Sequence, residues 1–159
     1  MISSSLDMLE ESLVKKIEVM KKIEEENEKQ KEILKNYDEV DDKAFEETVD
    51  NKGELIDQLL LLDEGFQALF DKVKEELGDN KDSYRDQIKR MQDLIQEITG
   101  LSASIEANER RNKKLAEGYF SAARQKMNYS RQTSAAAFNY YKTMNNFKDI
   151  PPQFIDKQN

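Results

Sequence analysis

A long helical repeat of apolar residues, from Tyr84 to about Phe138, is the feature that most constrains the fold of this chain. Up to Ile105 the apolar residues recur at steps of three and four, which places them on one face of an α-helix. They are Tyr84, Ile88, Met91, Ile95 and Ile98, with Leu94 and Leu101 beside them. This face is typical of a helix inside a bundle, so the pattern predicts one long helix packed against others.

The second half of this stretch has a different chemistry. From Asn108 the apolar face thins, and basic, small and amide-bearing residues replace it. A helix without enough apolar residues for a core of its own is typical of a segment that binds a partner. Aromatic residues gather here, and such residues are common interface anchors; they also suit docking onto the first two helices, and both interpretations stay open. They are Tyr119, Phe120, Tyr129, Phe138, Tyr140, Tyr141 and Phe147.

Two further helices are predicted before this one, over about 6–37 and 44–77. The apolar seam of the first is interrupted by Lys16, Asn27 and Gln30. The second is the most hydrophobic, and its run of four leucines at 59–62 predicts that it faces two neighbours at the centre of the bundle. Gly65 lies inside its pattern, and we interpret it as a position of close packing. Asp-rich residues 38–43 form the first connection, because aspartates favour turns and helix N-caps.

The predicted fold is therefore all-α: an elongated antiparallel three-helix bundle or coiled coil, with a long C-terminal helix over about 83–138. Residues 1–138 are expected to form a single helical domain, followed by a flexible tail over 139–159. Apolar residues make up 37% of the chain and charged residues 36%, a balance typical of long amphipathic helices. Five glycines and two prolines are too few for a fold with many strands and turns.

Charge is distributed unevenly along the chain. Residues 1–109 hold fifteen Lys/Arg and thirty Asp/Glu, whereas residues 110–159 hold ten and three. The acidic body opposes nucleic-acid binding. The basic end is either a solvated helix end that complements the helix dipole or a surface that orients an acidic partner.

Composition also limits location and chemistry. The N-terminus has no signal-peptide pattern, and the longest apolar run, Leu59 to Leu62, is far shorter than the roughly 20 residues that span a bilayer. We therefore expect a cytoplasmic protein without direct membrane insertion. The chain has no histidine and no cysteine, which excludes Ser-His-Asp, Cys-His, zinc and haem chemistry. No phosphate-binding glycine loop is present. We expect no enzyme activity, no cofactor and no metal.

Four amides suggest a polar layer inside the bundle: Asn27 and Gln30 in the first helix, and Asn108 and Asn112 in the third. An amide at a seam position costs stability but can fix the register between helices. The alternative is direct contact with a partner.

Three segments resemble the FlgN-type flagellar export chaperones. The first is Lys52-Gly53-Glu54-Leu55-Ile56-Asp57-Gln58-Leu59, followed by Leu62-Asp63-Glu64-Gly65-Phe66. The second is Asn108-Glu109-Arg110-Arg111-Asn112-Lys113-Lys114-Leu115, which is similar to an amide-containing motif of that family's last helix. The third is the tail, with Tyr140-Tyr141 and Pro152-Gln153-Phe154-Ile155-Asp156-Lys157.

The resemblance implies a cytoplasmic chaperone of type III protein export. Such proteins bind the C-terminal helices of hook-associated flagellar proteins, prevent early assembly and deliver them to the cytoplasmic domain of the export gate. Tyr140 or Tyr141 is implied in docking to the gate, although this tail lacks the usual glycine after the tyrosine. The implied substrate surface is the distal half of the last helix, with contact residues Asn112, Leu115, Tyr119, Ala122, Ala123, Lys126, Tyr129 and Phe138.

Two alternatives stay open at this stage. One is a structural coiled-coil or oligomerisation protein, and a homodimer is compatible with either function. The other is a chaperone for a different flagellar substrate, such as the filament cap.

Overall fold

The computed structural model describes the backbone of residues 2–144 and the surroundings of the side chains of residues 4–128. The all-α prediction is confirmed, and the described backbone contains no strand. Three helices, α1, α2 and α3, are joined by two short 3-10 turns, η1 and η2, in this order: α1 Ile2–Leu34, η1 Tyr37–Glu39, α2 Asp42–Leu77, η2 Asn80–Tyr84 and α3 Arg85–Met144.

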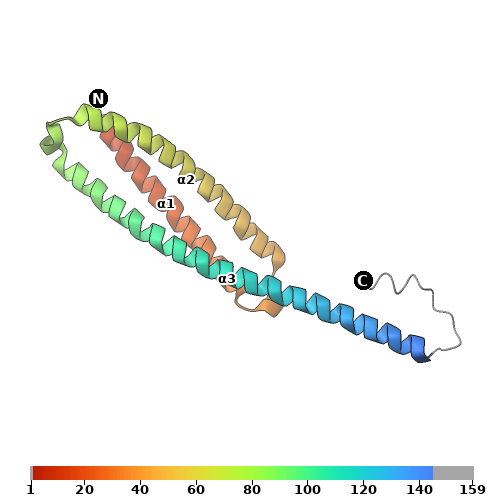
Figure 1. Cartoon of the computed structure of the whole chain (residues 1–159). Helices are drawn as coiled ribbons and strands as arrows, with labels where there is room; N and C mark the ends of the chain where they lie inside the picture. Colours follow the sequence, from red (N-terminus) through yellow and green to blue (C-terminus); the bar gives the residue numbers. More distant parts are fainter. Residues whose placement is uncertain (1, 145–159) are drawn as a thin grey trace. The chain divides into compact units, whose positions relative to one another are not determined.

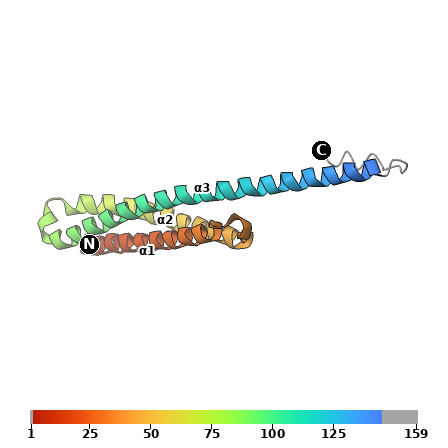
Figure 2. The ribbon, with the colours of Figure 1, turned by 90° about the horizontal axis from the view of Figure 1, so that it is seen from below.

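The chain divides into two compact units, Met1–Leu115 (unit 1) and Ala116–Asn159 (unit 2), and α3 contributes to both. This division differs from the predicted boundary after residue 138. In unit 1, α1, α2 and the first part of α3 lie side by side, as Figures 1 and 2 both show. Short connections join them, so that consecutive helices run antiparallel.

The helix ends differ from the predicted ones for local reasons. α1 ends at Leu34, before the predicted Tyr37, because Asn36 caps the turn η1 and its side chain accepts a hydrogen bond from the Asp38 amide at 3.1 Å. α2 begins after Asp41, whose Oδ1 accepts hydrogen bonds from two backbone amides. α3 runs on to Met144, because no proline precedes position 151.

The hydrophobic core is built mainly on α1. Its leucines Leu6, Leu9 and Leu13 are at most 4% exposed, and residues of the other two helices pack around them. The core cluster consists of Leu6, Leu9, Leu13, Ile17, Met20, Val73, Leu77, Met91 and Ile98. A second cluster joins Val19, Ile23 and Leu55.

The prediction that α2 occupies the centre of the bundle is wrong. Leu60 is 57% exposed and Leu61 is 71% exposed. The buried residues of α2 follow a single seam that includes Thr48, Lys52, Leu55 and Val73. Successive residues of a helix are about 100° apart, so Leu60 and Leu61 turn away from that seam. α1 takes the central place instead.

The predicted close packing at Gly65 is also wrong, because no described atom beyond the local backbone of α2 lies within 4 Å of the position that a Cβ atom would occupy there. Gly78 differs from it in backbone conformation. It follows α2 with a positive φ of 48°, which favours glycine.

These two glycines give opposite predictions for the same substitution. Gly65→Ala should raise the free energy of unfolding by about 0.5–1 kcal/mol, because alanine restricts the unfolded chain and fits the open helix surface. Gly78→Ala should lower it by about 1 kcal/mol, because alanine is strained at positive φ. Urea denaturation followed by circular dichroism measures both changes, and a destabilised Gly65→Ala variant would contradict the open surface.

None of the described helices has an apolar stretch long enough to cross a membrane.

Candidate functional site

A buried lysine stands at the centre of a polar layer that joins all three helices of unit 1. Lys52, on α2, is 8% exposed. Its ammonium group donates to Asn27 Oδ1 at 3.0 Å and to Gln30 Oε1 at 2.9 Å, both on α1. It also contacts both carboxylate oxygens of Glu109 on α3, at 2.8 and 2.9 Å. The lysine charge is therefore balanced by Glu109, and its three donors have protein acceptors.

Asn112 of α3 completes the layer from the other side. It is 3% exposed. Its Nδ2 atom donates to the backbone oxygen of Asn27 at 2.9 Å, and lies 3.2 Å from Gln30 Oε1 and 3.4 Å from Asn27 Oδ1. Asn27 and Gln30 thus receive hydrogen bonds from both neighbouring helices. This arrangement fixes the register of α1, α2 and α3 at one level.

The orientation of the Asn27 amide is set by its surroundings. Its Oδ1 faces two donors, Lys52 and Asn112, so turning the amide over would point an NH2 group at both. In the orientation adopted, its Nδ2 atom is buried and has no hydrogen-bond partner among the described residues. Such an orphan donor costs about 1–3 kcal/mol. The layer therefore contributes specificity of packing at a cost in stability.

A second ring of polar contacts covers the side of the layer between α1 and α3. Asn108 donates to both carboxylate oxygens of Glu24, at 3.0 and 3.1 Å. Arg111 contacts Asn108 Oδ1 at 3.2 Å and approaches Glu28 at 3.6 Å. Asn108 therefore belongs to this outer ring and not to the inner amide cluster.

Sequence reasoning found three of the inner residues, Asn27, Gln30 and Asn112, but missed the role of Lys52. A signal was present. Seam positions of α2 recur at steps of three and four through Phe45, Thr48, Lys52 and Leu55. A lysine at such a position faces the core and needs buried acceptors.

The layer makes a stability prediction. Lys52→Met should lower the free energy of unfolding by about 2–3 kcal/mol, because the buried acceptors of Asn27 and Gln30 lose their donor. The exposed Lys72 of the same helix is the matched control, and Lys72→Met should change stability by less than about 0.5 kcal/mol. Urea denaturation measures both, and equal effects would refute a structural role for the Lys52 ammonium.

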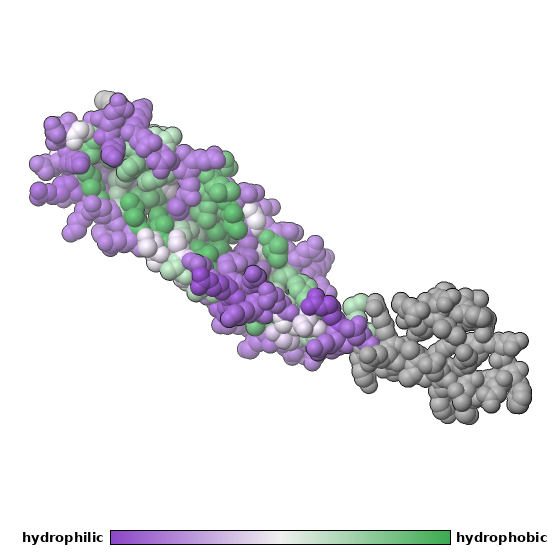
Figure 3. Space-filling model, in the orientation of Figure 1, coloured by the Kyte–Doolittle hydropathy of each residue, from purple (hydrophilic) through white to green (hydrophobic). Residues whose placement is uncertain are grey.

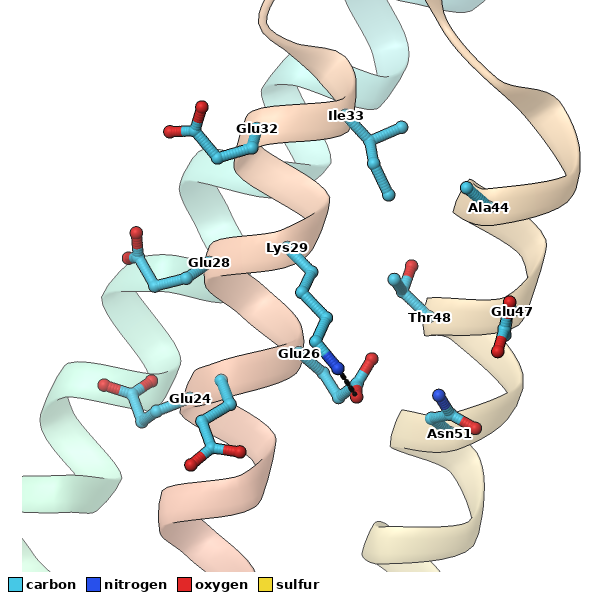
Figure 4. Close-up of a pocket in the computed structure, with 11 residues that line it drawn as sticks. Glu24, Glu26, Glu28, Lys29, Glu32, Ile33, Ala44, Glu47, Thr48 and Asn51 are labelled. Carbon is cyan, nitrogen blue, oxygen red and sulfur yellow. Dashed lines mark hydrogen bonds and ion pairs between the residues drawn. The ribbon is translucent and has the colours of Figure 1, made fainter.

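An acidic groove lies between α1 and α2 next to this layer. It encloses about 830 Å³, and six glutamates and one lysine are among its lining residues. Figure 4 shows Glu26 and Lys29 turned from α1 toward α2, whereas Glu28 and Glu32 point away from it. Lys29 donates to Glu26 Oε1 at 3.0 Å, and this bond raises the pKa of Lys29 above its ordinary value. Within the described part of the chain, no three acidic side chains converge as a metal site requires.

The predicted substrate-binding residues fall into three groups. Asn112 is buried in the polar layer, so we do not carry it forward as a partner contact. Leu115, Tyr119, Ala122 and Ala123 are half-buried and Lys126 is exposed. Residues 129, 138, 140 and 141, all in α3, have side chains outside the described set: Tyr129, Phe138, Tyr140 and Tyr141.

Exposed apolar residues are present in both units. In unit 2, Phe120 is 48% exposed and Met127 is 56% exposed, and the rings of Tyr119 and Phe120 lie 5.3 Å apart. On the face of unit 1 drawn in Figure 3, hydrophobic residues form a band between hydrophilic margins. Among the described residues of unit 1, the most exposed large apolar residues are Leu60 and Leu61, both on α2.

No family model, curated protein or solved structure matches this chain.

Proposed function

We propose that this protein is a cytoplasmic export chaperone of the FlgN type, which binds amphipathic C-terminal helices of hook-associated flagellar proteins. The observation that carries the proposal is the exposure of large apolar residues on a helix rich in small residues. Phe120 and Met127 are both about half exposed in unit 2. Ala116, Ala122 and Ala123 lie close to them in sequence and allow a second helix to approach closely.

The internal contacts of unit 1 also support the proposal. Two of the segments that resemble the family, around Lys52 and around Asn112, meet in the polar layer. Lys52 binds Glu109 of the second segment directly. The two motifs therefore share one structural role, which is to fix the register of the three helices.

The proposed contact face follows from helical spacing. Tyr119, Ala122 and Lys126 are separated by three and four positions, so they share one face of α3. Phe120 and Met127 lie along one edge of that face, about 80–100° around the helix from Tyr119. Leu115 precedes Tyr119 by four positions. An aromatic ring with small neighbours can accept the apolar side of a substrate helix, and Lys126 can orient an acidic one.

Covering that apolar side accounts for the chaperone activity. Each large apolar side chain that is fully buried contributes roughly 1.5–3 kcal/mol, offset by the entropy that association costs. A covered substrate helix cannot pack against its assembly partner. In this proposal Tyr140 or Tyr141, in the last turns of α3, docks the loaded chaperone to the cytoplasmic domain of the export gate.

The proposal predicts that Tyr119→Asp weakens substrate binding at least about tenfold, because an aspartate in an aromatic-centred contact is desolvated without a partner. Isothermal titration of the full chain with a hook-associated protein measures the affinity, and far-ultraviolet circular dichroism checks that the helices persist.

Leu61→Asp is the matched control, because it places the same charge at a 71% exposed apolar residue of α2. Its affinity should equal that of the wild type. An unchanged affinity of the Tyr119→Asp variant would argue against the proposed face. If the wild-type chain bound a filament-cap protein but no hook-associated protein, the filament cap would be the substrate.

A further inference from the structure

Glu26 carries a buried carboxylate oxygen that has no hydrogen-bond partner among the described residues. The residue is 7% exposed, and its Oε1 atom accepts a hydrogen bond from the ammonium group of Lys29 at 3.0 Å. Its Oε2 atom is buried and unpaired. In Figure 4 the Glu26 oxygen without a dashed line points toward α2, across the acidic groove. A charged oxygen in this position needs a donor, because burying it without one is costly.

The acidic groove continues along α1 and α2 past Glu26. A second hollow of about 270 Å³ shares Glu26 and Asn51 with it and extends it to Glu54. We call the two hollows together the α1–α2 groove. Asn51 lies at the level of Glu26, because the next residues of the two helices, Asn27 and Lys52, are hydrogen-bonded at 3.0 Å. The unpaired oxygen therefore lies where the two hollows meet.

Carboxylates outnumber amines along the α1–α2 groove. Of its seven glutamates, three are directed elsewhere: Glu24 binds Asn108 of α3, and Glu28 and Glu32 point away from α2. The other four outnumber the two lysines of the groove, which leaves two negative charges in excess. These residues are Glu25, Glu26, Glu47 and Glu54, with Lys22 and Lys29.

One of these lysines is already shared among several carboxylates. The hydrogen bond to Glu26, and more weakly the charges of Glu25 and Glu47, raise the pKa of Lys29 above its ordinary value. Among the described residues, neither Glu25 nor Glu47 forms an ion pair of its own. The groove therefore has room for further positive charge.

The carboxylates are spread along the groove at similar intervals. Glu47, Asn51 and Glu54 are separated by four and three positions, so they share one face of α2. At ~1.5 Å rise per residue, the two glutamates are about 10 Å apart along the helix, and Glu26 of α1 lies at a level between them. In the described part of the chain, no three acidic side chains converge on one point as metal ligands do. The arrangement suits an extended organic cation.

Apolar groups line the groove between its charges. Ile33 of α1 and Ala44 of α2 belong to the wider hollow, and Leu55 belongs to the narrower one. They can cover the methylene groups of a ligand. An aliphatic polyamine has this alternation, because short methylene chains separate its nitrogens. A single amine, or one lysine side chain of a protein, would satisfy Glu26 but leave Glu47 and Glu54 without a partner.

We propose that the α1–α2 groove binds an aliphatic polyamine, whose central amine donates to Glu26 Oε2 and whose outer ammonium groups pair with Glu47 and Glu54. The ligand supplies the donor that Glu26 lacks and offsets the excess of negative charge. It also links α1 to α2 beside the polar layer. The inference does not rest on the proposed chaperone function, because the proposed substrate face lies on α3.

Isothermal titration of the full chain with spermidine tests the proposal. We expect saturable binding of one molecule per chain. Glu26→Gln should weaken it at least about tenfold, because the charge-assisted bond at the centre of the site is lost. Glu32→Gln is the matched control: it removes the same charge from the same helix, but its carboxylate points away from α2. Its affinity should stay within about twofold of the wild type, since an exposed charge is screened.

A second variant covers the case in which Glu26→Gln fails to fold, which circular dichroism would reveal. Glu47 is exposed, so Glu47→Gln should fold normally and should weaken spermidine binding several-fold. N-butylamine, which carries one ammonium group, should bind much more weakly than spermidine to the wild-type chain. Equal affinities for these two amines would overturn the polyamine assignment.

Two further results would overturn the proposal. Absence of saturable spermidine binding by the wild-type chain would leave water as the donor to Glu26. Equal losses of affinity in Glu26→Gln and Glu32→Gln would indicate a diffuse attraction to the acidic body and not a site.

Hydrogen exchange locates the ligand independently of affinity. Saturating spermidine should slow the exchange of backbone amides in residues 22–33 and 44–54, because the ligand binds these two segments only when they are folded and packed together. The same concentration should leave these amides unchanged in Glu26→Gln. Binding without protection of these segments in the wild-type chain would place the ligand elsewhere and contradict the proposal.

Discussion

The arrangement of unit 1 depends on how one buried ammonium group is satisfied. Lys52 is buried, so acceptors from α1 and α3 must meet it at one level. Apolar seams alone permit neighbouring helices to slide by a turn at modest cost, because leucine and isoleucine pack acceptably in several registers. A slide here would separate Lys52 from Gln30 and Glu109 at once. The polar layer therefore selects one register from several of similar apolar burial.

The three helices contribute differently to the packing of the rest of unit 1. α1 supplies the buried leucines, and α2 and α3 pack their seams against it. Contacts at the margins support this order: Arg90 of α3 binds Glu10 of α1, and Lys16 of α1 binds Asp63 of α2. Glu10 also raises the pKa of Arg90 above its ordinary value. Exposed pairs of this kind contribute little stability, but they disfavour other pairings of the helices.

Periodicity predicted the helices well, because a seam needs only the right residue types at steps of three and four. It placed three of the four helix ends of α1 and α2 within four residues of those observed, and the fourth, Leu77, at the residue itself. It could not tell which helix is central. A run such as Leu59–Leu62 looks two-sided in sequence, but its outer members are exposed, because burial depends on where the neighbours lie. Lys52 was missed for a related reason: a long side chain can leave a seam for solvent, and only the positions of its acceptors decide.

The polar layer also divides unit 1 along its length. The main apolar cluster gathers Leu6 to Met20 with Val73, Leu77, Met91 and Ile98, whereas the layer around Asn27 and Lys52 lies toward the turn between α1 and α2. Apolar contacts weaken gradually as helices separate, but a hydrogen-bonded layer is lost once water enters it. We therefore expect local unfolding of unit 1 on heating to begin at the turn between α1 and α2 and not to reach the leucine cluster. One end of the bundle then stays packed while the other opens transiently.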